Sequence, residues 1–283
     1  MKINTNISSL TAQEAATSTN RSIAGSLEKL STGLKINKAS DDASGLAIAD
    51  KLRTQVTSIN QGISNGNSAI ALLQITDKSM AEQSKILDTI KSKLIQANTD
   101  TTSVAGRTAI AKDVTKLLQQ LNNIGEQTNY NGTTLLQKAR TTADASKEGN
   151  LTAARTAKGG LSFQIGEGTA DLITTRTINS NVAGLKLSAL AKAVRSGAKV
   201  SAGATAATTG VFTRTMAQSG QKAIDKAITT LNGYRGDIGS TQNQVESAVR
   251  NLMTQSTNIK NAESVIRDVD YAEESANFNK LNI

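Results

Sequence analysis

The chain has 283 residues and a formal charge of +9, and it contains no Pro, Cys, Trp or His. Without Cys or His it cannot form a Cys/His zinc site, a disulfide or a Ser-His-Asp triad, so most enzyme mechanisms are disfavoured. Hydrophobic residues are only 37% of the chain and aromatic residues 2%. An aliphatic, Ala-rich core suits helix bundles, and the lack of Pro removes the usual interruption of long helices.

The positive charge does not form a nucleic-acid motif. Between Leu172 and Ile224 the chain has basic residues and no acid, but Phe212 is the one aromatic residue there that could stack on a base. No apolar run reaches the roughly 18 residues of a membrane span, and the first six residues lack the apolar segment of a secretory signal. We therefore predict no nucleic-acid partner, no membrane segment and no cofactor.

In chain order, apolar residues first recur at heptad spacing over residues 3–34, which predicts an amphipathic helix. A polar break follows, where Ser40 is the expected N-cap and Asp41 and Asp42 are expected in the first helical turn. The pattern resumes from Leu46 to Ala97, a continuous helix of about 78 Å at the standard rise per residue. A third helix is predicted from Ile110 to Ile124.

The segment between these helices and the C-terminal region is irregular. Asn131-Gly132 is typical of a hairpin turn. Residues 161–165 alternate as a strand, 166–168 can turn, and 171–178 are rich in Thr and Ile, which predicts a second hairpin. Residues 141–160 and 195–210 have little to bury and are predicted as surface loops or weakly ordered connections.

A final apolar stripe recurs every seven residues from Ile224 to Ile266 and requires partner helices to cover it. The predicted fold class is mainly α: an elongated coiled-coil or helical-bundle rod made by the N- and C-terminal regions, with a small β-hairpin element. The predicted seam residues are Ile3, Ile7, Leu10, Leu27, Leu30, Leu34, Leu52, Val56, Ile59, Ile63, Ile224, Leu231, Ile238, Val245, Leu252, Ile259 and Ile266.

Five short stretches resemble bacterial flagellin, the subunit of the flagellar filament. They are the start MKINTNI at 1–7, LSTGLKIN at 30–37, DDASGLAIA at 41–49, QTNYNG at 127–132 and IRDVDYA at 266–272. The resemblance covers about residues 1–135 and 216–283, in the family's order. It implies a non-enzymatic subunit of a secreted, extracellular filament used for swimming.

The resemblance also implies a domain organisation and partners. Residues 1–40 would be the N-terminal inner-core helix, 41–180 the first part of the rod domain with its hairpin, 216–275 the returning rod helix, and 276–283 the start of a truncated C-terminal inner-core segment. Residues 181–215 would be a short surface segment in place of outer domains. The implied partners are further copies of the chain, the flagellar export apparatus, an export chaperone, the filament cap and the hook-junction proteins.

One stretch differs from the flagellins that the animal Toll-like receptor senses. At the aligned positions this chain has Thr89 for an Arg, Lys93 for a Leu and Asp113 for a Glu. Loss of a planar donor and of an apolar anchor should weaken that interface, so the pattern resembles the receptor-evading flagellins of the Campylobacter and Helicobacter kind. Little or no activation of the receptor is expected.

Two kinds of polar residue are candidates for chemistry or modification. The carboxylate pairs at 41–42, 268/270 and 273–274 are better explained by helix capping or by a solvated face than by a metal or glycosidase site. The family often carries O-linked sugars on its outward face, and here the candidates are Ser196, Ser201, Thr205, Thr208, Thr209 and Thr213. Two alternatives remain open: a hook–filament junction protein, which shares the terminal heptads, and a free coiled-coil scaffold.

Overall fold

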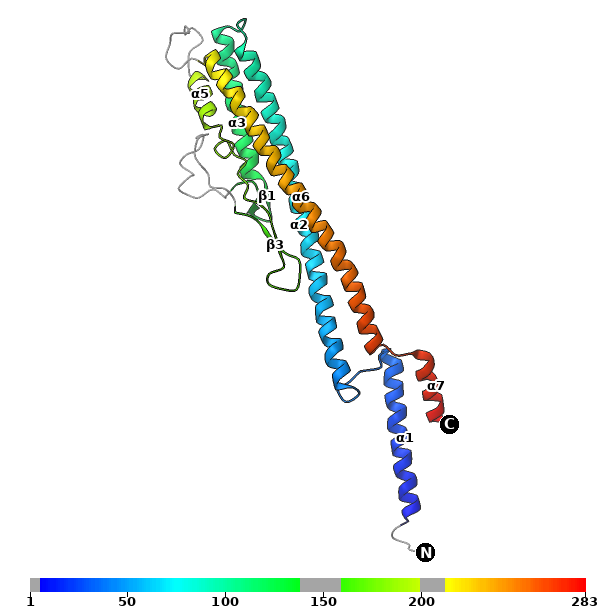
Figure 1. The fold of residues 1–283 in the computed structure, drawn as a ribbon. Helices are drawn as coiled ribbons and strands as arrows, with labels where there is room; N and C mark the ends of the chain where they lie inside the picture. Colours follow the sequence, from blue (N-terminus) through cyan, green and yellow to red (C-terminus); the bar gives the residue numbers. More distant parts are fainter. Residues whose placement is uncertain (1–5, 138–158, 199–211) are drawn as a thin grey trace. The chain divides into compact units, whose positions relative to one another are not determined.

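The computed structural model describes residues 6–137, 159–198 and 212–283, and most of them are helical (Figure 1). By their internal contacts they divide into two units. The terminal unit comprises Met1–Ile63 and Arg250–Ile283, and the central unit comprises Ser64–Val249. The prediction of a mainly helical fold with a small β element is confirmed.

The helices are longer and the strands shorter than in most globular domains. The helices are α1 (Ile7–Thr32), α2 (Ala43–Asn98), α3 (Val104–Gln127), α5 (Ser188–Ala198), α6 (Arg214–Arg267) and α7 (Tyr271–Asn282). The strands form two antiparallel pairs, β1 (Asn129–Tyr130) with β2 (Thr133–Thr134) and β3 (Ser162–Gln164) with β4 (Leu172–Thr174). The continuous helix predicted over 46–97 is confirmed by α2.

Side-chain caps define several helix ends. The Asn6 carboxamide accepts from the N–H of Ser9 at 3.3 Å at the start of α1, and Ser103 Oγ accepts from Gly106 N–H at 3.1 Å at the start of α3. The Arg107 guanidinium donates to the carbonyls of Ala97 and Thr99, which α2 leaves without helical partners at its end. Short polar side chains thus set where these helices begin.

The N-cap residue predicted for α2 was wrong. Helix α2 begins at Ala43, and Asp42 Oδ1 accepts from the N–H of Gly45 at 2.9 Å, so Asp42 and not Ser40 provides the side-chain cap. Neither Asp41 nor Asp42 lies in the first turn, because both precede the helix. Ser40, Asp41 and Asp42 are all of a type that caps helices, so their spacing in the sequence does not show which one forms the cap.

A continuous apolar core fills the central unit. It is built from one face each of α2, α3, α5 and α6. Its fully buried large side chains include Leu73, Met80, Leu87, Ile90, Leu94, Leu118, Leu121, Leu187, Phe212 and Ile224. Because Phe212 is buried in this core, it cannot serve as the base-stacking platform considered for nucleic acid.

Part of the segment predicted as surface is in fact core. Ser188–Ala198 form α5, which lies along α3 (Figure 1), and its Leu190, Ala191 and Val194 are buried. The prediction of a surface segment over 181–215 was therefore wrong for these residues and for Val182, Leu185 and Leu187. The spacing i, i+3, i+4, i+7 from Leu187 was present in the sequence but was diluted by Ala, Ser and Gly.

The two hairpins are both as small as predicted. Phe163 pairs with Ile173, and the Asn65 side chain of α2 donates to the carbonyl of Gln164 at 3.1 Å, which attaches the β3–β4 hairpin to the helix. In the first hairpin, Asn131 and Gly132 form the two-residue loop and have φ values of 49° and 77°. Both turns predicted from Gly and Asn are confirmed.

Candidate assembly interface

The ends of three helices are joined in the terminal unit by backbone hydrogen bonds. Leu34 and Asp268 form an isolated antiparallel bridge, the N–H of Lys35 donates to Arg267 at 2.6 Å, and the N–H of Val269 donates to Gly33 at 3.0 Å. Gly33 ends α1 with φ of 74°, a left-handed conformation that glycine adopts without a Cβ clash. This junction joins the segment after α1 to the segment between α6 and α7.

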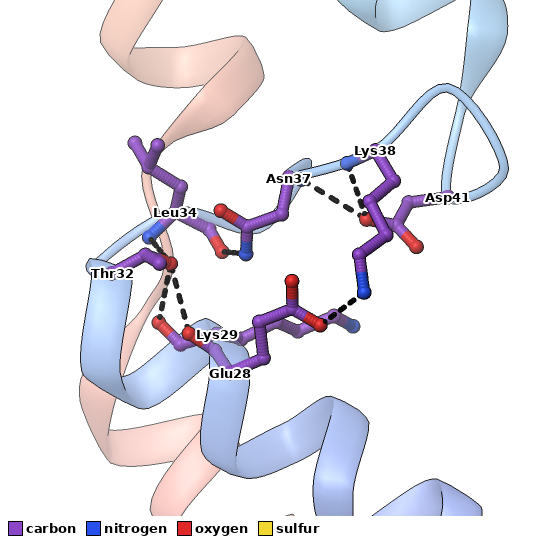
Figure 2. Close-up of polar contacts among 7 residues, drawn as sticks. All are labelled: Glu28, Lys29, Thr32, Leu34, Asn37, Lys38 and Asp41. Atoms are coloured by element: carbon purple, nitrogen blue, oxygen red, sulfur yellow. Dashed lines mark hydrogen bonds and ion pairs between the residues drawn. The ribbon is translucent and has the colours of Figure 1, made fainter.

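Polar side chains next to the junction fix the loop between α1 and α2 (Figure 2). The Asp41 carboxylate accepts from the backbone N–H groups of Lys38 at 2.9 Å and Asn37 at 3.0 Å, and these hydrogen bonds lower the pKa of Asp41 from its ordinary value. The Lys38 ammonium donates to Glu28 at 2.6 Å, and that hydrogen bond and charge raise the pKa of Lys38. Since these groups are exposed, the ion pair contributes little stability and mainly positions the loop.

Helix α7 lies beside the last turns of α1 (Figure 1). The Ser26 hydroxyl, which is buried, donates to Glu274 Oε1 at 2.5 Å. Asp270 Oδ1 caps α7 by accepting from the N–H groups of Ala272 and Glu273. The carboxylate of Asp270 therefore caps a helix, as predicted, whereas that of Glu274 accepts from a buried hydroxyl of α1.

The N-terminal part of α1 is exposed along its whole circumference. Every residue from Asn6 to Ser22 is exposed, with 75% of Ile7 and 58% of Leu10 accessible, and Leu27 is 54% exposed. Ile23, Leu30 and Leu34 are half-buried, and Ile3 lies outside the described residues. The first part of this stripe, which no described residue covers, is typical of a surface for other chains.

The predicted seam on α2 and α6 is covered to different degrees in the two units. In the terminal unit Val56 and Ile59 are buried, and Leu52, Ile63, Leu252, Ile259 and Ile266 are half-buried. In the central unit Ile224, Leu231, Ile238 and Val245 are all buried. The same heptad pattern thus supports a core in the central unit and leaves partly accessible apolar surface in the terminal unit.

The three residues of the altered receptor stretch lie on α2 and α3. Thr89 is exposed, and its hydroxyl donates to the carbonyl of Lys85 at 2.9 Å. Lys93 Nζ lies 3.3 Å from Asp113 Oδ2, so the structure brings these two together as an ion pair. A charged pair therefore lies where the resemblance implies an apolar anchor in the sensed flagellins.

The glycosylation candidates are divided by the structure. Ser196 is exposed on α5, whereas Thr213 is half-buried and its hydroxyl accepts from the N–H of Met216 at the start of α6. Ser201, Thr205, Thr208 and Thr209 lie outside the described residues. Of the two described candidates, Ser196 presents the freer hydroxyl for a sugar.

One buried polar contact was not anticipated from the sequence. The Gln83 amide, fully buried on α2, donates to the carbonyls of Leu121 and Ser180, both at 3.1 Å. It thereby links α2 to α3 and to the segment before α5. The available signal was a polar residue between Met80 and Leu87, where the heptad requires an apolar one.

The described residues show no site for metal chemistry and no membrane span. They contain no group of three or more potential metal-ligating side chains. Among the same residues, no helix has both the length and the apolar character needed to cross a bilayer. The terminal unit combines accessible apolar side chains on α1 with a hydrogen-bonded junction.

Comparisons with known proteins agree with this architecture. Residues 3–141 match the bacterial flagellin N-terminal helical region, and residues 221–283 match the C-terminal helical region. Flagellin B of Helicobacter pylori is 50% identical over 135 residues, which are 48% of this chain and 26% of that protein. Flagellin A of Helicobacter mustelae is 52% identical over 135 residues, 48% of this chain and 27% of that protein. The matched region thus spans about a quarter of these relatives.

One relative matches across the whole chain. Flagellin of Bacillus subtilis is 32% identical over an alignment of 302 positions that covers 100% of this chain and 92% of that protein. A solved structure of a putative flagellar hook-associated protein from Vibrio parahaemolyticus has a TM-score of 0.60 at 14% identity, covering 80% of this chain and 99% of that one, which shows the shared fold alone. On the whole-chain match and the two terminal regions, the chain belongs to the bacterial flagellin family.

Proposed function

We propose that this chain is a structural subunit that polymerises into the helical filament of a bacterial flagellum and serves swimming motility. The observation that carries the proposal is the apolar stripe on α1, where Ile7, Leu10 and Leu27 are each more than half exposed. Burying such side chains against a neighbouring copy removes them from water at about 1.5–3 kcal/mol each. Because contacts between different surfaces of identical copies need not close into a ring, they propagate as a helix.

The functional boundaries follow from the same proposal. Residues 1–40 and 276–283 would lie in the inner part of the filament, with 41–180 and 216–275 forming the rod around it. The two structural units change within α2 and within α6, so their limits do not coincide with these functional boundaries. The half-buried residues of the seam in the terminal unit would complete their burial on assembly.

The partners follow from the family as well. The chain would leave the cell through the flagellar export apparatus with an export chaperone, and it would assemble beyond the hook-junction proteins under a filament cap. It would act as an extracellular structural protein and not as an enzyme, with sugars on Ser196 among the described candidates. It would activate the flagellin-sensing Toll-like receptor weakly, because Thr89 and the Lys93–Asp113 pair replace the residues of the sensed flagellins.

The hook–filament junction protein is the less favoured alternative. Its support is a structural likeness at 14% identity, whereas both terminal regions match flagellin itself. A free coiled-coil scaffold has no observation that favours it over a family member.

Filament growth tests the proposal directly. Purified monomer is mixed with short filament seeds, and growth is followed by electron microscopy while hydrogen exchange is recorded before and after. We expect long filaments, and we expect the α1 amides to exchange rapidly in the monomer and slowly in the filament. The proposal fails if seeds do not elongate, or if filaments form while α1 remains unprotected.

A further inference from the structure

We propose that Asn131 is a site of spontaneous deamidation, at which the folded chain converts an amide to a carboxylate without an enzyme. The sequence contains three Asn-Gly pairs, at 65–66, 131–132 and 232–233. Asn-Gly is the dipeptide in which this reaction meets least steric resistance, because glycine leaves its backbone nitrogen unshielded. The fold treats the three pairs differently, and that difference carries the inference.

The reaction needs the backbone nitrogen of the glycine to reach the side-chain carbon of the preceding Asn. After the Gly132 N–H loses its proton, its nitrogen forms a bond to Cγ of Asn131, the Cγ–Nδ2 bond breaks, and ammonia leaves. Water then opens the five-membered imide at either carbonyl. The products are an aspartyl residue at position 131 or an isoaspartyl residue, in which the backbone gains one carbon atom.

The structure leaves this path open at Asn131. Asn131 and Gly132 are both exposed, and they form the loop between the paired residues Tyr130 and Thr133, outside the ladder. An added Cβ at Gly132 would meet nothing within 4 Å, so the space beside this glycine is open. Because the pair lies in a loop outside the helices, the backbone nitrogen of Gly132 makes no helical hydrogen bond.

The other two pairs are held by helices. Asn65 and Gly66 lie inside α2, where the Asn65 side chain donates to the carbonyl of Gln164 and a Cβ at Gly66 would lie 2.4 Å from Val249. Asn232 and Gly233 lie inside α6, where the surface is open but the backbone N–H is committed to the helical ladder. Ring closure at these pairs requires local unfolding first.

The two products differ in their effect on the fold. An aspartyl residue at position 131 retains the turn, because Asp-Gly also adopts this hairpin conformation. An isoaspartyl residue lengthens the loop and shifts the β1–β2 register. That shift should release the Leu135 N–H from the carbonyl of Thr128, which it reaches at 3.2 Å, next to the buried Leu136.

Mass spectrometry of the intact, aged chain tests the inference. The full-length protein is incubated at mildly alkaline pH, folded or in denaturant, and the tryptic peptides 117–138, 54–78 and 227–235 are compared for the mass gain of amide-to-acid conversion. Fragmentation assigns the gain to a residue. In the folded chain we expect conversion at Asn131 to be at least about tenfold faster than at Asn65 or Asn232, because those two must first open their helices. In denaturant the three rates should converge.

Two results would overturn the inference. One is a folded-state rate at Asn131 no higher than that at Asn232, and the other is a rate difference that persists in denaturant. Asn131→Asp serves as the matched control, since it lacks the reactive amide and keeps the turn. This variant should show no conversion in the 117–138 peptide at position 131 and normal hydrogen-exchange protection at Leu135, whereas the isoaspartyl fraction of aged protein should lose that protection.

Discussion

Leu231 and Leu10 both lie on apolar stripes, but the structure indicates that one serves folding and the other is accessible for assembly. Leu231 is fully buried on α6 among the core residues of the central unit, whereas 58% of Leu10 on α1 is accessible. Replacing each with Ala therefore separates folding from assembly. Thr19→Ala is the matched control, because Thr19 is exposed on the opposite face of α1 from Leu10.

The expected magnitudes follow from burial. Leu231→Ala removes a buried side chain and leaves a cavity, which should lower the free energy of unfolding by about 2–5 kcal/mol. Leu10→Ala removes a largely solvated side chain and should change that free energy by less than about 0.5 kcal/mol. If a neighbouring copy covers Leu10 in the filament, its loss costs up to about 1.5–3 kcal/mol per subunit contact, or a roughly 10- to 100-fold rise in the monomer concentration needed for growth.

The assay pairs two readouts on the same preparations. Denaturant unfolding followed by circular dichroism gives stability, and sedimentation of seeded filaments gives the residual monomer concentration. Thr19→Ala should leave both unchanged. The reasoning is refuted if Leu10→Ala lowers stability as much as Leu231→Ala does, or if it leaves the residual monomer concentration equal to that of Thr19→Ala.

Three further predictions follow from the junction and the α2 surface. Gly33→Ala should destabilise the end of α1 by about 1–3 kcal/mol, because it forces a side chain into a left-handed conformation against the Tyr271 hydroxyl. The α7 amides should then exchange faster. Gly25→Ala, inside α1 with nothing within 4 Å of the added Cβ, should instead stabilise α1. Since the pKa of Asp41 is lowered in the folded chain, its contribution to stability is present above the ordinary carboxyl pKa and is lost as the pH falls through the lowered value. The exchange protection of the Lys38 N–H, measured against an unstructured peptide at the same pH, should therefore fall in acid, and Asp41→Asn should remove that pH dependence. Thr89→Arg with Lys93→Leu should restore part of the Toll-like receptor response in a reporter-cell assay, and no gain over the parent chain would show that other residues prevent recognition.

Local pattern predicted much of this fold. Heptad spacing without Pro predicted the helix over 46–97, which the structure has as α2. Asn131-Gly132 predicted the first hairpin, because few other dipeptides accept two positive φ values. The flagellin-like motifs at both ends predicted the family that the comparisons confirmed. These are features in which neighbouring residues alone decide the conformation.

Other features needed the packed structure. The α5 stripe was diluted by small residues, and only its packing on α3 distinguishes it from a loop. Gln83 occupies an apolar heptad position because carbonyls from two other segments converge on its amide. No local rule tells which polar residue will meet a partner that is distant in the chain.

The predicted seam residues show most clearly what depends on the sequence alone and what depends on the tertiary structure. The sequence by itself determined that Leu10, Leu231 and Leu252 each lie on the apolar stripe of a helix, because that depends only on spacing along one element. Only the tertiary structure decided that Leu231 is core, that Leu252 is half-covered and that Leu10 is accessible. Burial depends on how many other elements flank a stripe: α2, α3 and α5 share one core with α6 in the central unit, whereas no described residue covers the first half of α1.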